Sequence, residues 1–160
     1  MNKYVITDPC YILPDDTWSK CCKVFDEYEN DEFMYQRFNE AVTMELRKFS
    51  GDNNAYAGET GYGDWSNEIY GDNIIHGEFG ADAGMVCVCK FTKQVEEALK
   101  EYDERCFALF EMEDDPTITF DCSDEHWTRI TVADKKGNAV YSKDNIPGYE
   151  DYDDDEDEGY

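Results

Sequence analysis

Residues 60–90 combine glycines, aromatic residues and a final apolar run, and this stretch restricts the fold more than any other part of the chain. Six glycines lie between positions 61 and 84, where they permit tight turns and backbone conformations with positive φ. After Gly84, alternate residues form two mainly apolar sets, and a period of two residues is that of a β-strand. The sequence therefore predicts turns that lead into a buried strand over residues 84–91.

The charge of the chain is strongly negative and unevenly distributed. The 160 residues contain 39 Asp and Glu against 14 Lys and Arg, a formal net charge of −25, together with 12 Tyr, 9 Phe and 3 Trp. A high net charge favours disorder, but this many aromatic residues favour a packed body. Residues 150–158 hold eight of the carboxylates, so residues 1–148 keep −17 of the −25. We predict one α+β domain over residues 1–148 and a disordered acidic tail over residues 149–160.

This charge also limits the partners. A strongly anionic protein is repelled by nucleic acid and by anionic membranes, and it is attracted to basic protein surfaces. The sequence shows no leader peptide and no run of about 18 apolar residues, so we expect a soluble, cytoplasmic protein. Seven cysteines are an odd number, which predicts free thiols rather than a disulfide framework. No cofactor is expected.

Three segments have the spacing of helices. The first begins at Asp15 or Asp16, either of which can cap its first turn, and ends at residue 28; another covers residues 92–103 and can be capped by Thr92. The second segment, residues 31–49, ends before Gly51, which suits a left-handed cap. Its apolar stripe consists of Met34, Phe38, Val42, Leu46 and Phe49.

Short strands are predicted on either side of these helices. Residues 106–112 are apolar on both faces, as in a central strand, and residues 134–137 indicate a hairpin turn. Helices early in the chain and strands late in it favour an α+β fold, a largely antiparallel sheet packed by two or three helices. The remaining predicted strands are residues 4–7, 55–60, 117–122, 126–133 and 138–142.

The sequence offers two weak chemical sites. The pairs Cys87-x-Cys89 and Cys122-x3-His126 have spacings that a tetrahedral zinc site could use. However, the alternation places Cys87 and Cys89 on the same face as other apolar residues, which is typical of core cysteines, so no metal is predicted.

Catalysis finds little support. Cys10 could act as a nucleophile with His76 or His126 as its base, but a chain with two histidines gives little support for such a pair. The chain contains no phosphate-binding loop, dinucleotide fingerprint or nucleophile elbow, and we predict that it is not an enzyme.

The acidic residues permit two interpretations. In the first, they only solvate the surface and keep the protein soluble. In the second, carboxylates on a folded face imitate the phosphates of DNA and occupy a basic groove on a partner, with the acidic tail as a further contact. The candidate tail residues are Glu150, Asp151, Asp153, Asp154, Asp155, Glu156, Asp157 and Glu158.

Three short motifs resemble a known family. The segment YVITDPCYI at residues 4–12, GYGDW at residues 61–65 with Tyr70, and FGADAG at residues 79–84 are similar to the "DPCYV", "GDG-Y" and "VDAG" elements of small uncharacterised phage and bacterial proteins. Trp65 stands where that family has its second glycine. The resemblance implies a phage or mobile-element setting in a bacterial cytoplasm, and it supplies no activity.

Small acidic phage proteins are often inhibitors of host nucleases, including anti-CRISPR and anti-restriction proteins. The expected function is therefore a non-enzymatic interaction protein that inhibits a basic, nucleic-acid-binding host defence protein, such as a nuclease, by charge mimicry of DNA. The alternative is a small-ligand or metal-binding module formed by the glycine-rich loops. Its pocket residues would be Asp8, Tyr11, Asp64, Trp65 and Asp82.

Overall fold

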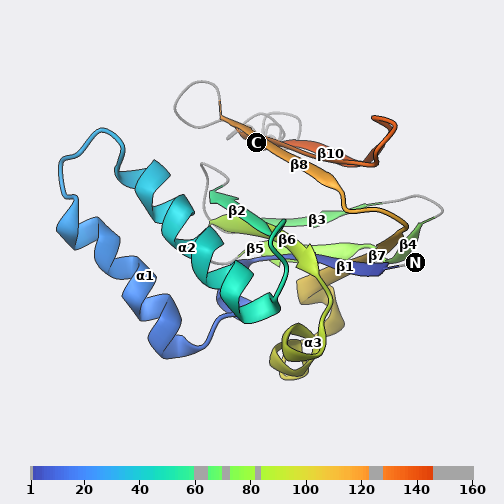
Figure 1. Cartoon of the computed structure of the whole chain (residues 1–160), viewed down its shortest axis with the longest axis horizontal. Helices are drawn as coiled ribbons and strands as arrows, with labels where there is room; N and C mark the ends of the chain where they lie inside the picture. Colours follow the sequence, from blue (N-terminus) through green and yellow to red (C-terminus); the bar gives the residue numbers. More distant parts are fainter. Residues whose placement is uncertain (1, 60–64, 70–72, 82–83, 123–127, 146–160) are drawn as a thin grey trace, which may run out of the picture.

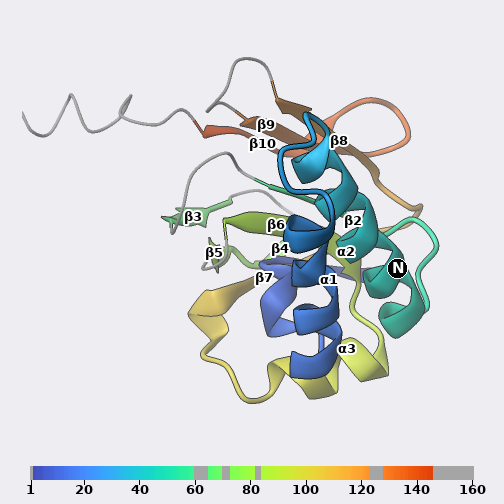
Figure 2. The same ribbon diagram turned by 90° about the vertical axis from the view of Figure 1, so that its left-hand side faces the viewer.

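The computed structural model describes residues 2–59, 65–69, 73–81, 84–122 and 128–145. Its centre is a five-stranded sheet with helices on one face and a smaller sheet on the other (Figures 1 and 2). The predicted α+β class is confirmed. Within the described residues, no helix has both the length and the apolar character that a membrane crossing requires.

The central sheet is built from strands that lie far apart in the sequence. Its order is β2-β6-β1-β7-β4, and every neighbouring pair is antiparallel. The predicted strand at residues 4–7 is β1, at the centre of the sheet. The bounds are Asn2–Thr7 for β1, Tyr56–Glu59 for β2, Ile74–His76 for β4, Met85–Lys90 for β6 and Phe107–Met112 for β7.

Alternation along these strands feeds two hydrophobic cores. Val5, Cys87 and Cys89 contribute to the core beneath the helices, whereas Tyr4 and Val88 contribute to the core on the opposite face. Because β1, β6 and β7 are covered on both faces, their sequences are apolar on both sides. The predicted central strand at residues 106–112 is thereby confirmed as β7.

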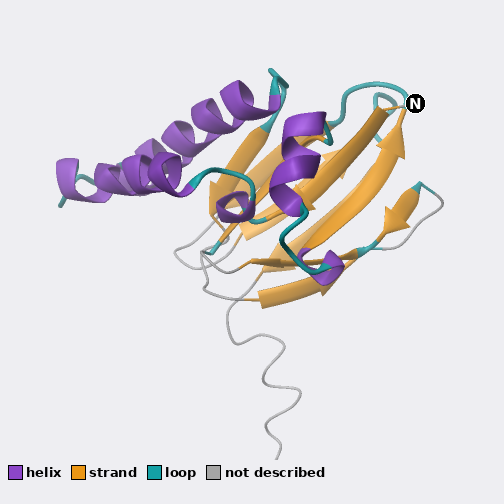
Figure 3. Cartoon of the chain, turned by 90° about the horizontal axis from the view of Figure 1, so that it is seen from below, coloured by secondary structure: helices purple, strands orange, loops and turns teal. Residues whose placement is uncertain are grey.

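The three predicted helices are present with shifted ends. They are α1 Asp15–Glu27, α2 Met34–Ser50 and α3 Lys93–Leu99, and Figure 3 shows them over one face of the sheet. Helix α2 starts three residues later than predicted, because the Asp31 carboxylate accepts from the Phe33 N–H at 2.7 Å and forms a turn. Gly51 ends α2 with φ +77°, as predicted, and its N–H donates to the Arg47 carbonyl.

Helix α3 is shorter than the predicted segment of residues 92–103. After Leu99 the chain turns, and the Asp103 carboxylate accepts from the Arg105 N–H to begin a 3-10 turn, η2, at Glu104–Cys106. A similar turn, η1, spans Pro9–Tyr11 after β1. These turns carry the chain into and out of the central sheet.

The second sheet has the order β10-β9-β8, with bounds Thr117–Cys122, Thr128–Ala133 and Ala139–Asn145 for β8, β9 and β10. The predicted hairpin between β9 and β10 is confirmed, since the Asp134 N–H donates to the Asn138 carbonyl and Gly137 adopts φ +90°. Val132 of β9 is buried against the central sheet. Residues 126 and 127 of the predicted strand lie outside the described residues.

The glycine-rich stretch contains more regular structure than the sequence predicted. In place of turns alone, it forms β3 Trp65–Glu68 and β5 Glu78–Ala81, which pair with each other, and the edge strand β4. The prediction was wrong because it counted the glycines and overlooked Phe79, which is fully buried in the core opposite the helices. One buried aromatic residue anchors β5.

Candidate binding surfaces

The described surface has more carboxylates than its cations neutralise. Seven Lys and Arg side chains of the described part form ion pairs with carboxylates, and Glu45 alone binds both Lys20 and Lys48. Arg47 instead donates to the Ala55 carbonyl at 2.8 Å. Exposed carboxylates of the described residues that have no ion pair are Asp15, Asp16, Asp26, Glu27, Glu29, Glu32, Glu40, Glu96, Glu101, Glu104 and Glu113.

The predicted loop pocket is described only in part. Asp8 is fully buried, and its carboxylate accepts from the Cys10 N–H at 2.9 Å to cap η1. Tyr11 is partly buried, and its ring packs on the ring of Tyr102 with 4.7 Å between centroids. Trp65 belongs to β3, but its side chain lies outside the described part, as do Asp64 and Asp82. Of the two residues whose side chains are described, Asp8 therefore caps η1 and Tyr11 packs against Tyr102. The pocket stays a prediction.

The cysteine candidates are core residues where they are described. Cys87 and Cys89 are buried on β6 within the core beneath the helices, and burial raises the pKa of both thiols. In the described part of the chain, no three His, Cys, Asp or Glu side chains gather as metal ligands. The side chain of Cys122 and all of His126 fall outside that part, so the zinc hypothesis that includes them stays open.

The proposed catalytic pair of Cys10 and His76 is not formed through the His76 Nε2 atom. That atom is buried and has no hydrogen-bond partner, whereas Cys10 is partly buried on η1. The alternative base, His126, lies outside the described residues, as do the eight acidic residues of the tail.

Thiol labelling tests the core position of the cysteines. Burial raises the pKa of Cys21 to about 11 and also raises the pKa of Cys87 and Cys89. A raised pKa leaves less thiolate at neutral pH, and thiolate is the reactive form. In the native protein we expect iodoacetamide to modify these three at least about 100-fold more slowly than in the unfolded chain. Of the six cysteines whose side chains are described, the partly buried Cys10 and Cys106 should be labelled first, as peptide mass spectrometry can show.

Elemental analysis of the same sample is the complementary measurement. We expect no stoichiometric zinc, because the described cysteines pack as apolar side chains. Rapid native labelling of Cys89, or a zinc ion that leaves only when the fold is lost, would contradict the core assignment. In the second case, the first ligands to substitute would be Cys87, Cys89, Cys122 and His126.

One hollow lies along the outer edge of β2, against α2. It has a volume of about 500 Å³, and Tyr35, Met44 and Tyr56 expose 53%, 53% and 37% of their surfaces beside it. The backbone edge of β2 is already satisfied at Ala57, because the Thr43 hydroxyl accepts from the Ala57 N–H and donates to the Ala57 carbonyl, both at 3.1 Å. Helix α2 thus closes this edge against pairing with another strand.

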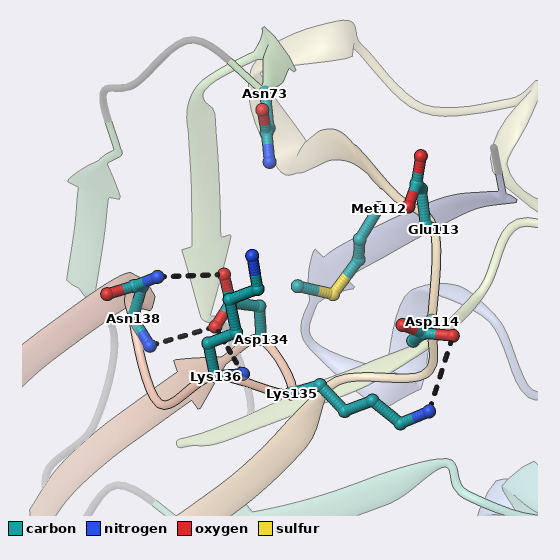
Figure 4. A pocket seen from close by; sticks show the side chains of 8 residues that line it. All are labelled: Asn73, Met112, Glu113, Asp114, Asp134, Lys135, Lys136 and Asn138. Carbon is teal, nitrogen blue, oxygen red and sulfur yellow. Dashed lines mark hydrogen bonds and ion pairs between the residues drawn. The ribbon is translucent and has the colours of Figure 1, made fainter.

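A second hollow, of about 290 Å³, lies where the two sheets meet. Figure 4 shows the β9–β10 turn facing Asp114, which follows β7, with a 3.7 Å ion pair between Lys135 and Asp114. The Asp134 carboxylate accepts from the N–H groups of Lys136 and Asn138, so it is committed to the turn. The Lys135–Asp114 ion pair thus connects the turn to the segment after β7, whereas the hydrogen bonds of Asp134 stay within the turn.

A third hollow, of about 330 Å³, lies between α3 and the strands β4 and β7. Phe91, Phe107 and Leu109 supply apolar walls, and the rings of Phe91 and Phe107 stack with 6.5 Å between centroids. His76, whose Nε2 atom lacks a partner, is on the lining of this hollow. The other lining residues are Glu96, Leu99, Lys100 and Glu104.

The sequence patterns did not predict these hollows. Tyr35 and Met44 fall outside the apolar stripe of α2, and an exposed apolar residue off the stripe is the signal that could have marked the first. The third joins β4, α3 and β7, whose proximity follows only from the sheet order. Comparison of the chain with protein-family models, curated proteins and solved structures gives no match. The likeness to the phage and bacterial family thus stays a prediction based on three short motifs.

Proposed function

We propose that this protein is a non-enzymatic, acidic binding protein that occupies the nucleic-acid site of a basic partner. The partner class that we propose is a bacterial defence protein, such as a CRISPR effector or a restriction nuclease, and the setting is a phage-infected bacterial cytoplasm. The resemblance of three short motifs to those of small phage and bacterial proteins supports that setting. The charge supports the partner, because an anionic surface is attracted to the cationic groove that holds DNA.

The observation that carries this proposal is the surplus of unpaired carboxylates on the folded body. Seven described cations are engaged in ion pairs, yet carboxylates at both ends of α1 and around α3 have none. Such carboxylates lose little by meeting an external cation, since no internal pair has to be broken. Close contact with the partner then adds to the long-range attraction, which is screened beyond about 8 Å at physiological salt.

The body rather than the tail should supply most of the binding. A chain that ends after Gly148 keeps −17 of the formal charge of −25, so deletion of residues 149–160 should weaken partner binding only in part. The affinity should fall as salt rises from about 50 to about 300 mM. Excess duplex DNA should compete for the same site.

The experiment begins with capture from bacterial lysate and identification of nucleases by mass spectrometry. The binding of each purified nuclease to the full chain and to the chain that ends after Gly148 is then measured, with and without excess duplex DNA and at several salt concentrations. Binding that ignores both salt and excess DNA would contradict mimicry, and it would favour the ligand-binding alternative. Full loss of binding on deletion of the tail would place the contact there and not on the body.

Two matched triple variants separate a contact face from net charge. One carries Asp26→Asn, Glu27→Gln and Glu29→Gln at the C-terminal end of α1, and the other carries Glu96→Gln, Glu101→Gln and Glu104→Gln around α3. Both remove the same charge from exposed positions that have no ion pair. A mimic with one contact face should lose affinity in one variant far more than in the other. Equal losses would indicate only a general attraction between opposite charges.

A further inference from the structure

The hollow between α3, β4 and β7 has the features of a site for a single cationic side chain. Its volume of about 330 Å³ lies at the small end of ligand pockets, near the size expected for one long side chain rather than a folded segment. His76 belongs to β4 and pairs with Leu109 of β7, so its ring lies at the sheet edge beside the apolar walls. The sheet, not a loop, therefore positions the floor of the hollow.

The charges at the rim are unbalanced. Lys100 is the only cation lining this hollow among the described residues, and its Nζ atom forms an ion pair with Glu97 at 3.0 Å. Arg105 is likewise paired with Asp103, at 3.2 Å. Glu96 and Glu104 line the same hollow without an ion pair. The rim thus has two carboxylates available to an incoming cation.

The His76 imidazole adds a ring nitrogen that forms no hydrogen bond with the described residues. Its Nε2 atom is buried and lacks a hydrogen-bond partner, which is costly for a polar atom and is relieved when a donor arrives. Without a proton, Nε2 accepts a hydrogen bond from an N–H group. An acceptor beside two carboxylates suits a ligand that has several donors.

We propose that this hollow receives an arginine side chain of a basic partner protein. The alkyl stem would lie against Leu99 and Leu109, and the guanidinium plane would face the stacked rings of Phe91 and Phe107. Guanidinium N–H groups would reach Glu96, Glu104 and His76. A metal ion fits less well, since no three ligands gather here within the described residues. Lysine has a compact charge and lacks the flat guanidinium face that stacks on aromatic rings.

This inference deepens the proposed function, and its test does not depend on that function. The probe is N-butylguanidinium, with butylammonium of the same alkyl length as the comparison. The full chain has two histidines, so their ring signals can be assigned in NMR spectra with a His126→Gln variant. We expect N-butylguanidinium to shift the His76 ring signals saturably and to bind more tightly than butylammonium.

Charge variants determine whether the rim carboxylates hold the cation. The double variant Glu96→Gln with Glu104→Gln should weaken N-butylguanidinium binding about tenfold, because each carboxylate accepts charge-assisted hydrogen bonds. Glu101→Gln is the matched control, an exposed acid between these positions that does not line the hollow, and it should change affinity by less than about twofold. The amide ¹H–¹⁵N spectrum verifies that each variant is folded.

Three results would overturn the site: no saturable shift, butylammonium binding as tight as N-butylguanidinium, or an equal loss in Glu101→Gln. The two proposals fail separately. If nuclease binding is not sensitive to salt and to DNA competition, but N-butylguanidinium still shifts the His76 signals, only the proposed function is rejected. If N-butylguanidinium does not shift the His76 signals, but a nuclease binds with the expected dependence on salt and DNA, only the arginine site is rejected.

Discussion

Phe38→Ala should lower the free energy of unfolding by about 3 to 5 kcal/mol, the usual cost of removing a large side chain from a core. Phe38 exposes 4% of its surface and lies where α1 meets α2. Its ring packs on Phe25 with 4.4 Å between centroids and edge-on against Trp18 at 5.8 Å. Deletion of the ring would leave a cavity and remove both contacts, so α1 would lose two of its aromatic contacts with α2.

Urea unfolding followed by circular dichroism measures this effect, with an unchanged m-value as evidence of the same two-state transition. Glu40→Ala on the same helix is the control, because Glu40 is exposed and has no ion pair, and it should change stability by less than about 0.5 kcal/mol. A loss at Phe38 no larger than at Glu40 would mean that the apolar stripe of α2 does not face a core. The helix itself would then become the candidate interface.

Elements with one strong period were predictable from the sequence. The stripe of α2 recurs every three or four residues, and Phe38, Val42 and Leu46 are all buried as that spacing requires. Strand β6 was recognisable from alternation, and its two sets of side chains enter two different cores. In both segments the local pattern and the tertiary packing act in the same direction, so the pattern alone gives the element.

The position of a strand in the sheet was not predictable where it depends on distant partners. Strand β1 reads as a short run of four residues, yet it is the central strand because β6 and β7 pair with its two edges. The three strands in the glycine-rich stretch were not predicted. Strand β4 is positioned by its pairing with β7, and β5 is positioned by its pairing with β3 and by the burial of Phe79. Pairing over long sequence separations leaves no local period.

The candidate surfaces divide in the same way. Composition predicts an acidic protein, but it does not say which carboxylates have partners. Glu45 of α2 binds Lys20 of α1 as well as Lys48 of its own helix, and only the first pair requires the tertiary fold. Glu96 and Glu104 are unpaired because neighbouring acids, Glu97 and Asp103, take the local cations. The anionic character was thus predictable, whereas its location was not.

Gly77→Ala should destabilise the protein by at least about 3 kcal/mol, at the upper end of the cost of overpacking. Gly77 connects β4 to β5, and a Cβ atom there would collide with the backbone carbonyl oxygen of Ile69. The Ile69 N–H donates to the Gly77 carbonyl at 2.7 Å, so the two backbones are held at this approach by a hydrogen bond. A backbone atom has no rotamer to change, and the added methyl group can be accommodated only if β5 moves.

The expected consequence extends to the core opposite the helices, because movement of β5 withdraws Phe79 from it. Amide hydrogen exchange should lose protection in β3 and β5 before it does in β6. Gly137→Ala is the control: its φ of +90° makes alanine strained, but nothing lies within 4 Å of the added atom, so the cost should be only about 1 to 2 kcal/mol. Equal losses at the two glycines would contradict the predicted collision, because Gly77 lacks the positive φ that strains an alanine at Gly137. A larger loss at Gly77, with exchange confined first to β3 and β5, would show that the glycine is needed for close approach of the backbones, as the density of glycines in this stretch suggests.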